Sequence, residues 1–223
     1  MTNSFEQISK SLIKRNRSEK TFKFFGLLGI IFAISLLVVI LSSIFIEGKK
    51  AFVSTYVNVE VFFDSKIIDP DNTKKDSEIK FANFKKIIGN SLLKNFPDVT
   101  DRKEKIKLTS FISSSEEDNL MSLVLNDKTL INQTKNLWLL ASSTIDVINK
   151  NPEMVKFNEE ERLIDDKELE WFQKMQSEER VKFSANNNFF TKADSTEPEQ
   201  AGIWGALMGS FFTLFITLIL SFP

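Results

Sequence analysis

The sequence predicts a membrane protein in which two transmembrane α-helices flank an α+β domain outside the cytoplasm. Residues 24–46 and 201–223 are two runs of 23 residues that contain no charged side chain. A helix rises about 1.5 Å per residue, so each run is long enough to cross a hydrocarbon core about 30 Å thick. The 154 residues between the runs are varied in composition and long enough to bury a core of their own.

The first 23 residues carry a topology signal. They contain six Lys or Arg against two Glu, whereas the rest of the chain has an excess of acids. Basic residues beside a first span are retained in the cytoplasm. We therefore expect residues 1–23 to be cytoplasmic and residues 24–46 to be an uncleaved anchor, because the run ends in SIFIEGKK without a signal-peptidase site. The basic residues that carry this signal are Lys14, Arg15, Arg17, Lys20 and Lys23.

The same basic cluster also suits acidic lipid or nucleic acid. A net charge of -1 argues against a general nucleic-acid binder, so we expect contact with membrane lipid and none with nucleic acid.

Three segments of residues 47–200 have the pattern of strands. In YVNVEVFFD, Val57, Val59 and Val61 alternate with polar residues, which is typical of a half-buried strand. NLWLLAS, residues 136–142, is an apolar run of strand length, and VKFSANNNFF, residues 181–190, is expected to be a strand that leads into a turn.

Three helices are predicted in the same region. One runs from Ile79 to near Asn95, and two more begin at Ser114 and Asp165, where Ser114-x-x-Glu117 and Asp165-x-x-Glu168 have the spacing of capping boxes. The apolar faces are expected to be Phe81, Phe84, Ile88 and Leu92; Leu120, Met121, Val124 and Leu125; and Leu169, Phe172 and Met175. Strands and helices together predict a mixed α+β domain at residues 47–200.

The composition excludes several kinds of catalytic site. The chain has no His and no Cys, so it has no Ser-His-Asp or Cys-His nucleophile, no zinc site with such ligands and no disulfide. We expect no catalytic residue, no metal and no cofactor.

Two acidic patterns resemble known kinds of site. The acids at 159–161 and 165–166 could form a glycosidase-like pair, but they precede a predicted helix, whose N-terminal N–H groups favour acids. The spacing Asp69, Asp71, Thr73 resembles a calcium loop, yet Lys74 stands where the loop needs Gly and Lys80 where it needs Glu. Neither pattern is expected to be a site. Trp138 and Trp171 are expected in the core or an interface.

The second uncharged run carries a strip of small residues. Ala201, Gly205 and Gly209 recur every four residues, and Thr213 and Thr217 continue the same helical face. Small residues let another helix approach closely in a membrane, so these positions are candidate helix-packing residues. The alternative is a lone anchor that happens to contain glycines.

The last part of the chain resembles a known family. FFTKADSTEPEQAGIWGALMGSFFTLFITLILSFP closely resembles the PstA-type permease subunit of bacterial phosphate-specific ABC transporters, in a subtype with an enlarged periplasmic segment between its first two spans. YVNVEVFFDSKIIDP, PDVTDR and LWLLASSTIDV are similar to the same subtype, so the resemblance covers most of residues 20–223.

The resemblance implies a non-enzymatic permease of the bacterial inner membrane. It implies a pore for inorganic phosphate, driven by ATP hydrolysis on cytoplasmic ATP-binding subunits, with a second permease subunit and a periplasmic phosphate-binding protein as partners. Ala201, Gly205 and Gly209 match the small-residue face of the second span, and Pro223 matches a family proline. Residues 201–223 are then the start of that span, and the chain is expected to be an N-terminal fragment, with four further spans to follow.

A two-span sensor is the main alternative. Chemoreceptors and histidine kinases share the order of cytoplasmic start, span, outer domain and span. Their second span normally leads into a charged helical linker, so the sequence after Pro223 discriminates the two.

Overall fold

The computed structural model describes residues 2–222, with side chains from Glu19 onward, so those of Lys14, Arg15 and Arg17 and the whole of Pro223 lie outside the described residues. The chain divides into two compact units, Met1–Lys50 and Ala51–Pro223.

The first unit consists of helix α1, Thr2–Gly48, which leads into the 3₁₀ helix η1, Lys49–Phe52. Helix α1 runs unbroken through the predicted span at 24–46, and every side chain from Glu19 to Lys49 is exposed. The hydroxyl of Ser35 donates to the Phe32 carbonyl at 2.7 Å, so it is satisfied within the helix. By its length and composition, the segment Glu19–Phe52 is long and apolar enough to cross a membrane.

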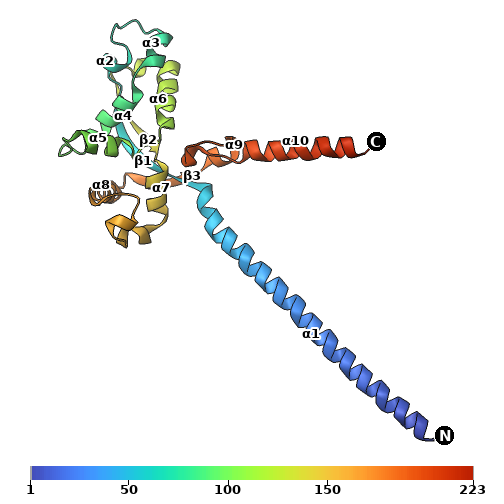
Figure 1. Ribbon diagram of the computed structural model, residues 1–223. Coiled ribbons are helices and arrows are strands. Elements are labelled where there is room, and N and C mark those ends of the chain that lie inside the picture. The colour runs from blue at the N-terminus through green and yellow to red at the C-terminus, as the bar shows by residue number, and fades with distance from the viewer. Residues whose placement is uncertain (1, 223) are drawn as a thin grey trace. The chain divides into compact units, whose positions relative to one another are not determined.

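A three-stranded antiparallel sheet lies at the centre of the second unit (Figure 1). Strand β1, Val53–Phe62, is central, with β2, Thr134–Leu140, on one side and β3, Val181–Ala185, on the other. All three predicted strands are confirmed. Val57, Val59 and Val61 are fully buried, as their alternation predicted.

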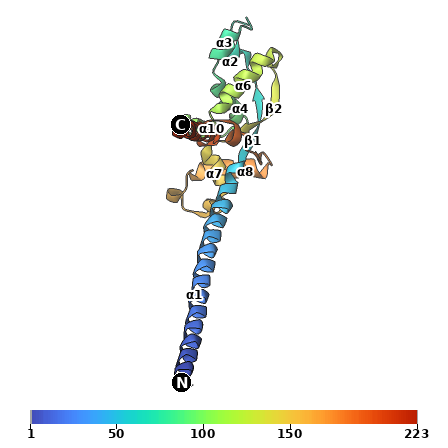
Figure 2. The ribbon, with the colours of Figure 1, turned by 90° about the vertical axis from the view of Figure 1, so that its right-hand side faces the viewer.

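Helices α4 and α6 cover one face of β1 and β2 (Figure 2), and α7 contacts β1. The helices of this unit are α2, Ser65–Ile68; α3, Asp76–Phe81; α4, Phe84–Leu93; α5, Arg102–Thr109; α6, Ser115–Asn126; α7, Ser143–Lys150; α8, Asp166–Ser177; α9, Asn187–Thr191; and α10, Trp204–Ser221. Short 3₁₀ helices are η2, Lys128–Leu130; η3, Pro152–Lys156; η4, Glu159–Glu161; and η5, Pro198–Gln200.

The helix predicted from Ile79 to Asn95 is two helices, so that prediction was wrong in its continuity. Helix α3 ends at Phe81, and the Asn83 side chain accepts from the Lys86 N–H at 2.8 Å to begin α4. An Asn that bonds to nearby backbone competes with a continuous helix. Phe81 is 92% exposed as a result, whereas Phe84, Ile88 and Leu92 are buried as predicted.

The two predicted capping boxes have different outcomes. At α8, Asp165 accepts from the Glu168 N–H at 2.8 Å and Glu168 accepts from the Asp165 N–H at 2.9 Å, so the box is formed. At α6, Ser114 makes no capping bond to the backbone, so this box was wrongly predicted, although the helix itself is confirmed.

Helix α8 completes the core. Leu169, Phe172 and Met175 are buried as predicted, and the ring of Trp171 lies 6.1 Å from that of Phe111. Trp138 is 38% exposed, and the ammonium of Lys182 lies 3.9 Å from its ring centroid. Of Trp138 and Trp171, only Trp171 is therefore a core residue.

Helix α10 is the second helix long and apolar enough to cross a membrane, and none of its apolar window is buried. It begins at Trp204, three residues later than the uncharged run. The Gly202 N–H donates to the Ala193 carbonyl at 2.9 Å and the Ile203 N–H to the Phe189 carbonyl at 2.9 Å, which fixes this segment outside the helix. The assignment of Ala201 to the helical small-residue face was therefore wrong, whereas Gly205, Gly209 and Thr213 lie in α10.

Candidate functional site

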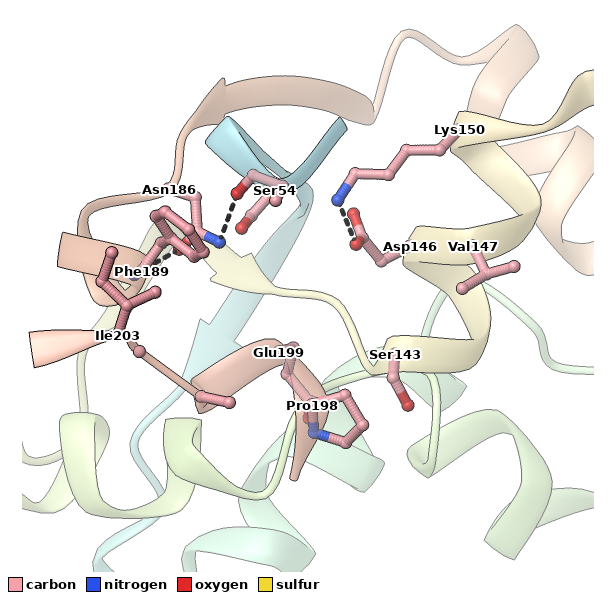
Figure 3. Close-up of a pocket in the computed structure, with 13 residues that line it drawn as sticks. Ser54, Ser143, Asp146, Val147, Lys150, Asn186, Phe189, Pro198, Glu199 and Ile203 are labelled. Atoms are coloured by element: carbon pink, nitrogen blue, oxygen red, sulfur yellow. Dashed lines mark hydrogen bonds and ion pairs between the residues drawn. The ribbon is translucent and has the colours of Figure 1, made fainter. Parts of the chain in front are cut away.

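A cavity of about 330 Å³ lies where four segments of the chain meet, and we call it the junction cavity (Figure 3). It is lined by the start of β1, by α7, by the turn from β3 into α9, and by the Pro198–Ile203 segment that leads into α10. It is the candidate site, because it brings the first residues of the folded domain together with the segment that leads into α10.

Asp146 and Lys150 form an ion pair on the α7 side of the junction cavity (Figure 3), with a distance of 2.5 Å between carboxylate and ammonium. Their side chains are 15% and 12% exposed. The other carboxylate oxygen of Asp146 accepts from the Thr55 N–H at 2.8 Å, and Asn149 donates to the Thr55 hydroxyl at 3.1 Å. This pair ties α7 to β1, so its charges are engaged in structure.

Asn186 joins the two ends of the domain. Its amide donates to the Ala51 carbonyl at 3.0 Å, its N–H donates to the Phe52 carbonyl at 2.9 Å, and its side-chain oxygen caps α9 by accepting from the Phe189 N–H at 3.1 Å. The ring of Phe52 lies 5.4 Å from that of Phe189 and stacks on Phe190 at 5.7 Å. The first residues of the domain are thus held against the segment that precedes α10.

Gly202 is required by this close approach. A Cβ at this position would collide with the carbonyl oxygen of Lys192 and would lie 2.5 Å from that of Asn188. Both obstacles are backbone atoms, which cannot rotate away.

Glu199 separates the junction cavity from a smaller one of about 180 Å³. It is 6% exposed, and one of its carboxylate oxygens is buried without a hydrogen-bond partner among the described residues. The Ser142 hydroxyl, which lines the smaller cavity, is also buried without such a partner. The neighbouring Gln200 donates to the Ser114 hydroxyl at 3.3 Å.

A second buried acid, Glu116 of α6, bonds to the last residue of β2. Its carboxyl accepts from the Leu140 N–H at 3.2 Å and from Asn119 at 3.1 Å. Burial raises the pKa of Glu116 above its ordinary value, although these hydrogen bonds and Lys192 oppose the shift. The pKa of Tyr56 is raised by burial and by the charge of Glu116.

Of the predicted helix-packing residues, Ala201 lines the junction cavity, whereas Gly205, Gly209 and Thr213 do not. In α10, a Cβ on Gly205 would touch Ala193 at 3.1 Å, and one on Gly209 would meet nothing within 4 Å. The Thr213 hydroxyl donates to the Gly209 carbonyl at 2.8 Å. Of the topology residues with described side chains, Lys23 pairs with Glu19 at 2.6 Å, and Lys20 is exposed.

The acids of the two acidic sequence patterns also lie outside the lining of the junction cavity. Asp69 is buried, accepting from the N–H groups of Thr73 and Lys74 at 2.8 and 2.9 Å. Glu159, Glu160, Glu161 and Asp166 are exposed, and Asp165 caps α8. Among the side chains described from Glu19 onward, no group of three or more acids is arranged to hold a metal ion.

Sequence reasoning did not single out Asp146, Lys150, Asn186 or Glu199. The Asp146–Lys150 spacing of four residues is a helical pair signal, but helix α7 itself was not predicted. Asn186 caps α9 locally, but its bond to Ala51 spans 135 residues and has no local signal. No local pattern marks Glu199.

Comparison with known proteins gives a family match. Residues 9–159 match the family described as a domain of unknown function, DUF3333. No curated protein and no solved structure matches the chain. The match spans α1, β1, β2 and α2–α7, with β3, α8 and the segment leading to α10 beyond it. Because it covers more than half of the chain, the protein belongs to the DUF3333 family.

Proposed function

We propose that the chain is part of a membrane-embedded permease subunit of an ABC importer for inorganic phosphate. Residues 51–203 are a domain outside the cytoplasm, and α1 and α10 are membrane spans on either side of it in sequence. The importer's chemistry, ATP hydrolysis, belongs to separate cytoplasmic subunits. The phosphate substrate rests on the resemblance of residues 189–223 to PstA-type permeases.

One observation carries the membrane-anchored architecture. The domain's first residues, Ala51 and Phe52, are bonded to Asn186 and packed on Phe189, and the Ile203 N–H that precedes α10 is bonded to the Phe189 carbonyl. Both connections to apolar segments therefore leave from one end of the domain, as a domain resting on a membrane surface requires.

The exposed apolar side chains support the same proposal. Phe25, Ile31, Val39 and Phe45 of α1 are each more than half exposed, as are Phe211, Leu214 and Leu218 of α10. Burying such side chains in lipid is favourable by about 25 cal/mol per Å². The basic residues before residue 24 favour a cytoplasmic N-terminus.

Cysteine labelling tests the topology directly, because the chain has no Cys of its own. In intact cells, a membrane-impermeant maleimide is expected to label Ser122→Cys, on the exposed side of α6, but to label Asn3→Cys only after the membrane is permeabilised. Labelling of both positions in intact cells, or of neither, contradicts the proposed topology.

Phosphate uptake tests the function. In cells that depend on the complete gene for phosphate import, its deletion is expected to abolish uptake of radioactive phosphate, and restoring the gene is expected to recover it. Unchanged uptake would overturn the permease proposal. A change in transcription or motility instead would favour the two-span sensor.

A further inference from the structure

An acid-free basic groove lies between α4 and α5. This groove, of about 620 Å³, is lined by Lys85, Lys86, Arg102 and Lys105 together with polar and apolar residues, and no Asp or Glu contributes to the lining. All four cations are exposed, and none forms an ion pair within the described part of the chain. Ile106, 60% exposed, adds an apolar contact among them.

The charge of the groove is not shared by the domain as a whole. Residues 80–107 carry eight Lys or Arg against three Asp or Glu, whereas residues 51–200 together carry 21 against 27. The two acids of α5 and its cap are also engaged elsewhere: Asp101 caps α5 by accepting from the Lys103 N–H at 2.7 Å, and Glu104 pairs with Lys167 at 2.6 Å. Lys85 also lines the smaller cavity, together with Glu117, Glu197 and Glu199. The uncompensated positive charge of the groove therefore lies on Lys86, Arg102 and Lys105.

A segment of opposite charge lies on the same domain. Residues 153–170 carry eight Asp or Glu against three Lys or Arg. Glu159–Glu161 form η4, all three are exposed, and none forms an ion pair within the described residues. Asn158, Glu159 and Glu160 line an open hollow of about 740 Å³. Phe157 and Leu163, 46% and 57% exposed, flank this segment in sequence.

The two surfaces are neighbours. The N-terminus of α8 follows η4 closely in sequence, and it is joined to α5, which lines the groove, by the ion pairs Lys107–Asp165 and Lys167–Glu104. When a basic and an acidic surface lie side by side on one chain, two copies related by a two-fold axis can pair them twice. The basic surface of each copy then contacts the acidic surface of the other.

We propose that two copies of this domain associate through these surfaces, with η4 of each copy seated in the α4–α5 groove of the other. The proposal is independent of the transported substrate. Along α5 the lining extends from Arg102 to Thr109, about 10 Å at 1.5 Å per residue, so an acidic segment of several residues contacts more of it than a single phosphate ion does. The flanking Phe157 and Leu163 supply apolar contacts that Ile106 can meet.

Position-specific cross-linking tests the proposal on the full chain in nonionic detergent micelles. Tagged Lys86→Cys copies are mixed with untagged Glu160→Cys copies and treated with a short bis-maleimide cross-linker. Cross-linked dimers that contain both copies are expected. In the matched control, Ser122→Cys replaces Lys86→Cys. Equal yields in the two mixtures, or no dimer in either, would overturn the proposal.

Charge exchange provides the second test. Energy transfer between copies labelled at Ser122→Cys is expected to show at least about tenfold weaker association for K86E/K105E and for E159K/E160K, because like charges then face each other. Mixing the two charge-reversed variants is expected to recover association. Circular dichroism checks that both are folded. Failure of folded variants to recover on mixing, or association unchanged between 50 and 500 mM NaCl, shows that the apolar helices or another surface hold the copies together.

Discussion

Asp146 shows how one side chain can hold two elements together. Its carboxylate oxygens accept from the Thr55 N–H of β1 and from Lys150 one turn along α7. Removing one partner of a largely buried pair leaves the other charge without compensation.

We therefore expect Asp146→Ala to lower the free energy of unfolding by about 2–4 kcal/mol. The control is Lys167→Ala, which breaks a more exposed pair, with side chains 48% and 27% exposed, and is expected to cost at most about 1 kcal/mol. Urea denaturation followed by tryptophan fluorescence measures both. Equal losses of unfolding free energy would show that the Asp146–Lys150 pair contributes no more to stability than the more exposed pair.

The raised pKa of Glu116 predicts the sign of one pH dependence of the domain's stability. Because burial raises its pKa in the folded state, its contribution to stability is full below the unfolded pKa of about 4.3 and is lost as pH rises through the folded pKa. Glu116→Gln keeps an oxygen that can accept from the Leu140 N–H but cannot ionise. The variant is expected to be more stable than the wild type at pH 8 and to depend less on pH above about pH 4. A variant that is less stable at pH 8 would show that the Glu116 charge is favourable, through Lys192.

At the scale of elements, apolar periodicity identified the strands and the positions of α6 and α8, but local polar contacts decided the helix ends. The patterns at Ser114 and Asp165 are equivalent in sequence. Asp165 adopts an extended backbone that brings its side chain to the Glu168 N–H, whereas Ser114 is already helical in its backbone. The break at Asn83 likewise depends on a side-chain bond that periodicity does not report.

Matched alanine substitutions test this difference. Asp165→Ala is expected to cost about 0.5–2 kcal/mol, since it removes an N-cap, and the loss of the bond to Lys107 adds to it. Ser114→Ala is expected to change stability by at most about 0.5 kcal/mol. Thermal unfolding by circular dichroism measures both, and a larger loss for Ser114→Ala would contradict the structure at α6.

At the scale of the molecule, the folded unit is longer than the family match. Strand β3 pairs with Val53–Val57 of β1, and α8 supplies Trp171, Phe172 and Met175, which are 5%, 2% and 0% exposed. Both β3 and α8 lie beyond residue 159, where the match ends.

A fragment of residues 51–159 is therefore expected not to fold cooperatively, whereas residues 51–203 are expected to fold. Burial of three large apolar side chains contributes roughly 5–9 kcal/mol, which is comparable with the total stability of a typical domain. Near-UV circular dichroism and a urea titration compare the two fragments. A cooperative transition in the shorter fragment would show that α8 and β3 are dispensable.

The sequence by itself determined the two uncharged helices, the alternation of β1 and the apolar faces of α6 and α8, because each depends on contacts between residues close in the chain or on composition alone. Only the tertiary structure decided the strand order, the isolation of Phe81, the place of Ala201 outside α10 and the junction cavity. Asn186 bonds to Ala51, 135 residues away in sequence, and Asp146 bonds to Thr55, 91 residues away. Such contacts form only when the tertiary fold brings distant parts of the chain together, so the local spacing of residues does not predict them.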